Sequence, residues 1–176
     1  KNFGEENTNK KMTSKMKKRI YIIIGLVLII GTAVFLRVYN LPEQGLWFDE
    51  ILSAATAEKD LSYILQDSNS WLHYLFVKIG LLLSYTIISA KVFSIIAGAI
   101  SVLVLYFIGY AMKDKLTGFL AAGLGAILPV HIYFSQEVRY YAYILLFASL
   151  FFLFFIKLQK QDRFIWGALF LASAAA

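Results

Sequence analysis

The chain has 176 residues, of which 60% are apolar and 16% charged, and its net charge is +6. Soluble domains are on average about 45–50% apolar and about 25% charged. The composition therefore excludes an ordinary soluble domain and a disordered chain. The sequence contains no Cys, which excludes a disulfide scaffold, a thiol nucleophile and a cysteine-based metal site.

Charged residues are grouped between long uncharged runs. A bilayer core about 30 Å thick requires roughly 17–25 apolar residues in a helix, and several runs have this length. They predict an all-α integral membrane protein, a polytopic helical bundle. The expected helices, the last one cut short by the end of the sequence, are 20–36, 91–112, 116–134, 140–156 and 164–176.

The segment 1–19 is polar and basic, with six Lys and one Arg. The positive-inside rule places such a segment in the cytoplasm. This segment explains most of the positive net charge, so nucleic acid is not an expected partner. Because the sequence lacks an initiator Met and stops 13 residues into its last apolar run, it is interpreted as the N-terminal part of a longer protein.

The segment Trp71–Ser89 is apolar, but Lys78 interrupts it. If it crossed the membrane, the basic loops at 113–115 and 157–163 would lie outside. If it lies in the interface, both loops fall in the cytoplasm beside the basic N-terminus, as the charge rule requires. We therefore predict a long external loop over 37–90 with a helix that does not span.

Small residues in the predicted helix 116–134 recur at four-residue spacing, at Gly118, Ala122 and Ala126. Such a stripe allows a second helix to approach closely. It predicts helix packing, and no chemistry is attached to it.

Two polar clusters, Trp47–Glu50 and Ser135–Tyr140, fall on the external side in this topology and can therefore meet. Asp49 and Glu50 either cap the helix that follows or supply a general base or a metal-binding carboxylate. In the second cluster, Glu137 and Arg139 either form an ion pair that marks a helix boundary, or Arg139 holds a phosphate with its planar fork.

Three further charged or titratable residues carry weaker signals. Lys78 either extends towards the headgroups or contacts an anionic lipid. Lys91 marks the start of a helix, and His131 is interpreted as hydrogen-bonded inside the bundle. With two His and no HExxH spacing, a catalytic zinc site is not expected.

Three stretches resemble the N-terminal part of GT-C-type glycosyltransferases, in the protein-mannosyltransferase and aminoarabinose-transferase superfamily (family 39-like). They are Arg37–Glu50, Asn69–Phe93 and His131–Ala142. Members of that family typically carry an Arg-Leu-Tyr stretch leading to Leu-Trp-Tyr-Asp-Glu in the first external loop, and later a Ser-Gln-Glu-Ala-Arg-Met-Tyr-Ala-like run. The resemblance covers roughly residues 20–160.

The resemblance implies a GT-C helical bundle whose first external loop contains juxtamembrane helices. It implies a hexosyl- or pentosyltransferase in the cell membrane that moves a sugar from a polyprenyl-phosphate donor to an acceptor protein or glycolipid at the external face, with inversion. Asp49 is the implied general base, with Glu50 beside it as the second catalytic residue. No cofactor is required, although a divalent metal ion at this pair is an option.

In the reaction that the resemblance implies, the departing lipid phosphate gains negative charge, and a cation placed there would stabilise the transition state. Arg139 is the first candidate for binding this phosphate and Lys78 the second, while Glu137 and Tyr140 support the site. The 176-residue chain alone is expected to be inactive.

The chain departs from the family at Asn69–Tyr74, where relatives carry a His-Pro-Pro-Leu-Tyr-Tyr-like segment. The His-Pro pair is absent, and His73 stands four positions late, so it is not given the role of the family's His. The alternative hypothesis is a non-catalytic membrane scaffold or subunit of the same fold. A transporter fragment ranks last, because the interiors of the first four predicted helices carry no charge.

Overall fold

The computed structural model describes residues 3–66, 71–84, 86–160 and 164–175. None of these described residues belongs to a β-strand, which confirms the all-α class. The helices, with one short 3₁₀ turn, are α1 (Phe3–Val38), η1 (Leu41–Glu43), α2 (Phe48–Glu58), α3 (Leu61–Gln66), α4 (Trp71–Leu83), α5 (Ile87–Met112), α6 (Lys115–Ile127), α7 (Pro129–Ser135), α8 (Tyr141–Lys160) and α9 (Phe164–Ala175).

In the described part of the chain, three helices are long and apolar enough to cross a membrane, namely α1 over Arg19–Val38, α5 over Ile88–Met112 and α8 over Tyr141–Lys160. The pair α6 and α7 forms a fourth candidate span, which is bent by 61° at a break. Helix α4 is apolar but has only 13 residues, whereas a spanning helix needs about 20. The length of α4 therefore agrees with the prediction that this segment does not span.

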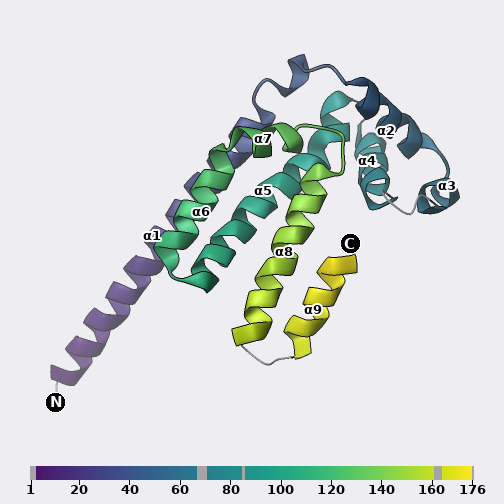
Figure 1. Ribbon diagram of the computed structural model, residues 1–176. Helices are drawn as coiled ribbons and strands as arrows, with labels where there is room; N and C mark the ends of the chain where they lie inside the picture. Colours follow the sequence, from purple (N-terminus) through teal and green to yellow (C-terminus); the bar gives the residue numbers. More distant parts are fainter. Residues whose placement is uncertain (1–2, 67–70, 85, 161–163, 176) are drawn as a thin grey trace.

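Helix α5 lies at the centre of the bundle and packs against α1, α4, α6 and α8. In its most apolar stretch 61% of the residues are buried, compared with 6% for α1 and 28% for α8. The short helices α2, α3 and α4 gather at the end of the bundle away from the N-terminus (Figure 1). The turn between α7 and α8 lies at this same end, whereas the α5–α6 connection lies at the other (Figure 1).

Helices α1, α5 and α8 extend beyond the apolar runs that predicted them, and α8 ends at Lys160 instead of residue 156. Helix α1 starts at Phe3 instead of residue 20, since the preceding segment contains no Pro and is rich in Lys, Met and Glu, which have high helix propensity. Helix α5 starts at Ile87 instead of 91, because Thr86 caps it: the Ser89 N–H donates to Thr86 Oγ1 at 3.2 Å, and the Thr86 N–H donates to Ser89 Oγ at 3.1 Å.

The predicted helix over 116–134 is broken at Leu128. Pro129 has no N–H and disfavours a helical conformation for the residue before it, and Leu128 has an extended backbone with φ −64° and ψ 117°. Pro129 then occupies the first turn of α7, where a missing N–H is tolerated.

At the other end of α6, Asp114 caps the helix. The Thr117 N–H and hydroxyl donate to Asp114 Oδ1 at 2.9 and 2.8 Å, and these bonds hold the pKa of Asp114 below its ordinary value.

The small-residue stripe on α6 is a close packing surface, as predicted. Gly118, Ala122 and Ala126 are all buried, and the last two pack with Ala33 of α1 and Val102 of α5. A Cβ added to Gly118 would lie 2.7 Å from a backbone carbonyl of α5, so only glycine allows this approach.

Candidate functional site

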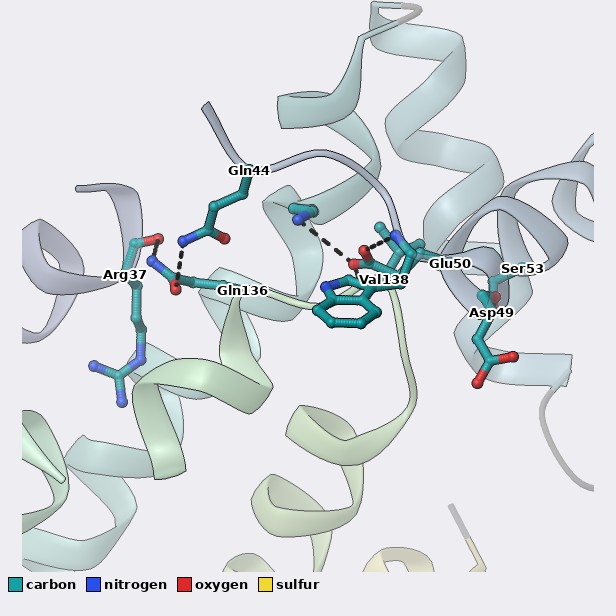
Figure 2. A network of polar contacts seen from close by, with 9 residues as sticks. Arg37, Gln44, Asp49, Glu50, Ser53, Gln136 and Val138 are labelled. Carbon is teal, nitrogen blue, oxygen red and sulfur yellow. Dashed lines mark hydrogen bonds and ion pairs between the residues drawn. The ribbon is translucent and has the colours of Figure 1, made fainter. Parts of the chain in front are cut away.

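Glu50 lies in the first turn of α2 and is buried, with 1% of its surface exposed. Its Oε2 accepts a 2.9 Å hydrogen bond from the Trp47 N–H, which caps the start of α2. Its Oε1 accepts a 2.6 Å hydrogen bond from the Val138 N–H and lies 3.5 Å from Lys91 Nζ, which is also buried. Glu50 therefore joins α2, α5 and the turn after α7 at one point (Figure 2).

Asp49 faces the opposite way from its neighbour. Successive residues of an α-helix are about 100° apart, so when Glu50 faces the bundle, Asp49 faces outward. The Asp49 carboxylate points away from Glu50 (Figure 2) and is 61% exposed. Its Oδ2 lies 3.4 Å from Arg139 Nη2. The two predicted clusters thus meet through one ion pair, between Asp49 and Arg139, and one hydrogen bond, from the Val138 N–H to Glu50.

Arg139 projects from the turn between α7 and α8, over the rings of Tyr140 and Tyr141, with its guanidinium carbon 5.6 and 5.8 Å from their centres. Burial is the largest influence on the pKa of Arg139 and lowers it. The Tyr141 hydroxyl and then the Asp49 carboxylate act the other way, so that the pKa of Arg139 is raised overall. Arg139 is therefore a permanent cation.

Gln136 attaches the turn to the end of α1. Its amide nitrogen donates to the carbonyls of Leu36, Arg37 and Tyr39, at 3.3, 3.1 and 3.4 Å. Its Oε1 accepts a 3.2 Å hydrogen bond from Gln44 (Figure 2). The last carbonyls of a helix lack partners within the helix, so Gln136 supplies the cap that α1 requires.

Two adjoining cavities open beside these residues. A cavity of about 270 Å³ is lined by Gln44, Gly45, Trp47, Glu50, Lys91, Tyr133, Gln136 and Glu137. A second of about 250 Å³ is lined by Trp47, Asp49, Glu50, Tyr133, Phe134, Glu137, Arg139 and Tyr141. Both walls combine aromatic rings with carboxylates, and both include Glu137. The predicted supporting residue Glu137 therefore lies where the two cavities adjoin.

Lys78 lies far from this meeting point. It projects from α4, and its ammonium group donates to the carbonyls of Ala57, Glu58 and Lys59, at 3.1, 3.4 and 2.8 Å. These carbonyls are at the C-terminal end of α2, whereas Asp49 is at the N-terminal end. Lys78 therefore caps α2 in this structure and is not brought to Arg139.

A charged side chain that the sequence predicted only as the first residue of the family-like stretch Arg37–Glu50 is completely buried. Arg37, with 0% exposure, donates to the Ala33 carbonyl at 2.8 Å and to Ser135 Oγ at 3.2 Å. Its guanidinium also lies 3.0 Å from His131 Nδ1. His131 itself is buried and hydrogen-bonded, with Nε2 2.9 Å from Ser101 Oγ, which agrees with its interpretation from sequence.

Lys91 and Gln136 were also missed as site residues. A charged group close to an apolar span is costly unless it is paired, so Lys91 next to a predicted span was a signal for a buried acid. Gln136 belongs to the predicted polar cluster Ser135–Tyr140, but its role as the cap of α1 is seen only in the structure.

His73 is buried behind the turn, with 3% exposure. Among the described residues, neither of its ring nitrogens has a hydrogen-bond partner of normal geometry. Burial and then the positive charge of Arg139 lower the pKa of His73 to about 4, while the Val138 backbone acts weakly in the opposite direction. The positions Asn69 and Ser70, where the family's His-Pro pair is missing, lie outside the described residues.

The carboxylates do not fit a shared metal ion in this arrangement. Both oxygens of Glu50 already accept hydrogen bonds, and Asp49 points away from them (Figure 2). No group of three His, Asp or Glu side chains within the described ranges could hold a metal ion. A divalent ion remains a prediction from the resemblance alone.

No protein family, curated protein or solved structure matches the chain. The functional argument therefore stands on the geometry of the site and on the resemblance of its motifs.

Proposed function

We propose that the chain is part of a membrane glycosyltransferase of GT-C type, which transfers a sugar from a polyprenyl-phosphate donor to an acceptor at the external membrane face. The observation that carries the proposal is the pairing of Asp49 and Arg139 at the wall of a cavity at one end of the bundle. A transfer of this kind requires a base and a cation close together, at the level where a lipid-borne phosphate meets water.

Asp49 is assigned the role of general base. Its carboxylate is exposed and, once it separates from Arg139, takes a proton from an acceptor hydroxyl as that oxygen attacks the anomeric carbon. The bond between the anomeric carbon and the phosphate oxygen breaks, and the electron pair stays on the phosphate. A single displacement of this kind inverts the anomeric centre.

Arg139 is assigned to the phosphate that leaves. Its guanidinium remains charged and presents a planar fork suited to phosphate oxygens, and it stabilises the negative charge that develops there. We assign Glu50 to holding the site together and not to the chemical step, because its oxygens are occupied by α2, α5 and the turn.

The alternative function is a non-catalytic scaffold of the same fold. One observation favours it: Asp49 and Arg139 neutralise each other across 3.4 Å, an arrangement that also suits a purely structural contact. The same pair in a transferase must separate when the donor binds.

The test uses membranes that contain the full-length protein, supplied with radiolabelled polyprenyl-phosphate sugars. Release of label from the lipid is measured for wild type, Asp49→Asn, Arg139→Ala and the control Glu43→Gln. Glu43 is an exposed carboxylate in η1, at the same end of the bundle, and it lines neither cavity described above.

We expect turnover to fall at least about a hundredfold in Asp49→Asn, the lower end of what a general base contributes, and to remain near wild type in Glu43→Gln. Unchanged turnover in Asp49→Asn would refute the assignment of the base. No turnover by folded wild-type protein with any donor would favour the scaffold.

A further inference from the structure

Arg37 is an unusual residue for its position, because it is charged, completely buried and at the end of a candidate membrane span. Among the ion pairs found in the described residues, none involves Arg37. Its described hydrogen-bond partners are instead backbone carbonyls, a hydroxyl and an imidazole. An ionisable group at this depth is costly, so its position is a candidate for a functional role.

Two of the three carbonyls that Arg37 reaches, those of Gly125 and Ala126, lie where the helix break removes backbone hydrogen bonds. In an unbroken helix the Gly125 carbonyl would accept from the N–H of residue 129, but Pro129 has none. Arg37 Nη2 donates to Gly125 O and Nη1 donates to Ala126 O, both at 3.4 Å. His131 Nδ1 also lies 2.7 Å from Gly125 O. Arg37 therefore replaces helix hydrogen bonds lost between α6 and α7.

The same side chain holds the far end of α7. Arg37 Nε donates to Ser135 Oγ at 3.2 Å, and Ser135 in turn donates to the His131 carbonyl at 2.6 Å. The fit is tight, because a Cβ on Gly98 of α5 would lie 2.1 Å from Ser135 Oγ and 3.0 Å from Arg37 Nε. One guanidinium thus fixes both ends of the seven-residue helix α7 relative to α1.

The turn that follows α7 begins one residue later. Gln136 binds the last carbonyls of α1, and the next three residues supply Glu137 to the cavities, the Val138 N–H to Glu50 and Arg139 to Asp49. The other half of the site also starts from the end of α1, since η1 and α2 follow it along the chain. Both sides of the site, the turn 136–140 and the start of α2, are therefore attached to the end of α1.

We propose that Arg37 is a positioning residue, which sets the place of the turn 136–140 relative to Asp49 by holding α7 against the end of α1. The inference rests on the proposed function for its importance to turnover, but the geometric claim does not depend on any activity. Arg37 acts through Ser135 and the carbonyls of the break, and it touches none of the groups assigned to the reaction.

The experiment uses the full-length protein in nanodiscs, in a background without other Cys, and measures distances between spin labels by electron paramagnetic resonance. The site pair is Phe48→Cys at the start of α2 and Ile144→Cys in the first turns of α8, two exposed positions. The control pair is Met112→Cys and Phe152→Cys, exposed positions on α5 and α8. Each pair is measured in wild type, Arg37→Lys and Ser135→Ala.

Lysine keeps the charge but lacks the planar fork with which Arg37 bridges several partners. We expect Arg37→Lys to turn one narrow distance distribution for the site pair into a broad or shifted one, and to leave the control pair unchanged. Ser135→Ala removes only a hydroxyl and is expected to shift the site pair in the same direction by less. If Arg37→Lys does not fold, the Ser135→Ala variant still tests whether the contact between Arg37 and Ser135 sets the distance of the site pair.

An unchanged site pair in the folded variants would overturn the inference. Equal broadening of both pairs would also overturn it, because Arg37 would then support the whole bundle and not the position of the turn. Loss of turnover in Arg37→Lys with both distributions unchanged would refute the positioning role while leaving the proposed function intact.

Discussion

The buried ion pair between Glu50 and Lys91 gives the sharpest energetic prediction. The two side chains are 1% and 2% exposed, and their charged atoms are 3.5 Å apart. Removing one partner from a buried pair typically costs about 3–5 kcal/mol of unfolding free energy, because the other charge remains buried without compensation. For a domain of 150–250 residues each kcal/mol shifts the melting temperature by about 2–4 °C.

We therefore expect Lys91→Met and Glu50→Gln each to lower the melting temperature by roughly 6–20 °C. The loss should be larger for Glu50→Gln, since Glu50 also accepts the N–H groups of Trp47 and Val138. The double variant should lose less than the sum of the single variants, by a coupling energy of about 1–3 kcal/mol. The assay is thermal unfolding in nanodiscs, followed by intrinsic fluorescence.

The matched control is the neighbouring pair of Asp49 and Arg139, which is 61% and 24% exposed. Exposed pairs contribute about 0.2–1 kcal/mol, so Asp49→Asn and Arg139→Gln should shift the melting temperature by no more than about 4 °C. Our reasoning would be refuted if Lys91→Met were as mild as Asp49→Asn, or if the effects of Glu50→Gln and Lys91→Met were simply additive.

Two further predictions concern pH and topology. The pKa of His73 is lowered to about 4 in the folded chain and is near 6.5 in the unfolded chain, so the unfolded chain binds more protons between these two pH values. We therefore expect the free energy of unfolding to fall as the pH is lowered from about 6.5 to about 4, as measured by thermal unfolding. A fall of the same size in His73→Phe would contradict this prediction. The proposed topology predicts that, in intact cells, a membrane-impermeant maleimide labels Phe48→Cys but not Met112→Cys. Both native side chains are exposed, at 80% and 61%, and Met112 ends α5 at the opposite end of the bundle from α2 (Figure 1). The reverse labelling pattern would place the cavities on the cytoplasmic side.

The sequence predicted the long apolar helices and showed that the two polar clusters could meet, because both follow from local patterns and charge counts. It did not predict which acid of the pair Asp49 and Glu50 is buried. That choice depends on which side of α2 packs against α5 and the turn, and adjacent residues of an amphipathic helix are equally plausible candidates until the packing is known. The burial of Arg37 could not be predicted from local sequence either, because three of its hydrogen-bond partners are 89, 94 and 98 residues away in the chain.

The break between α6 and α7 is a different case. Pro129 carried the signal, because the residue before a proline tends to leave the helical conformation. The break was not predicted because the apolar run continues across it, and a membrane span predicted from length and hydropathy alone is assumed to be straight. Pro129 alone marks the position of the bend in the sequence, whereas the contacts of Arg37 and His131 with the freed carbonyls are seen only in the packed structure.

The separation of Arg37 from its partners has a consequence for biosynthesis. Chains grow at about 5–20 residues per second, so the 98 residues between Arg37 and Ser135 require roughly 5–20 s. During this interval α1 enters the bilayer with a guanidinium whose partners on α6 and α7 have not yet been made, and of its described partners only the Ala33 carbonyl is already present. An arginine near a helix end can extend to the interface, and we expect Arg37 to do so until α6 and α7 are in place. We therefore expect the final depth of α1 to be set late, when the polar contacts of Arg37 with α6 and α7 form.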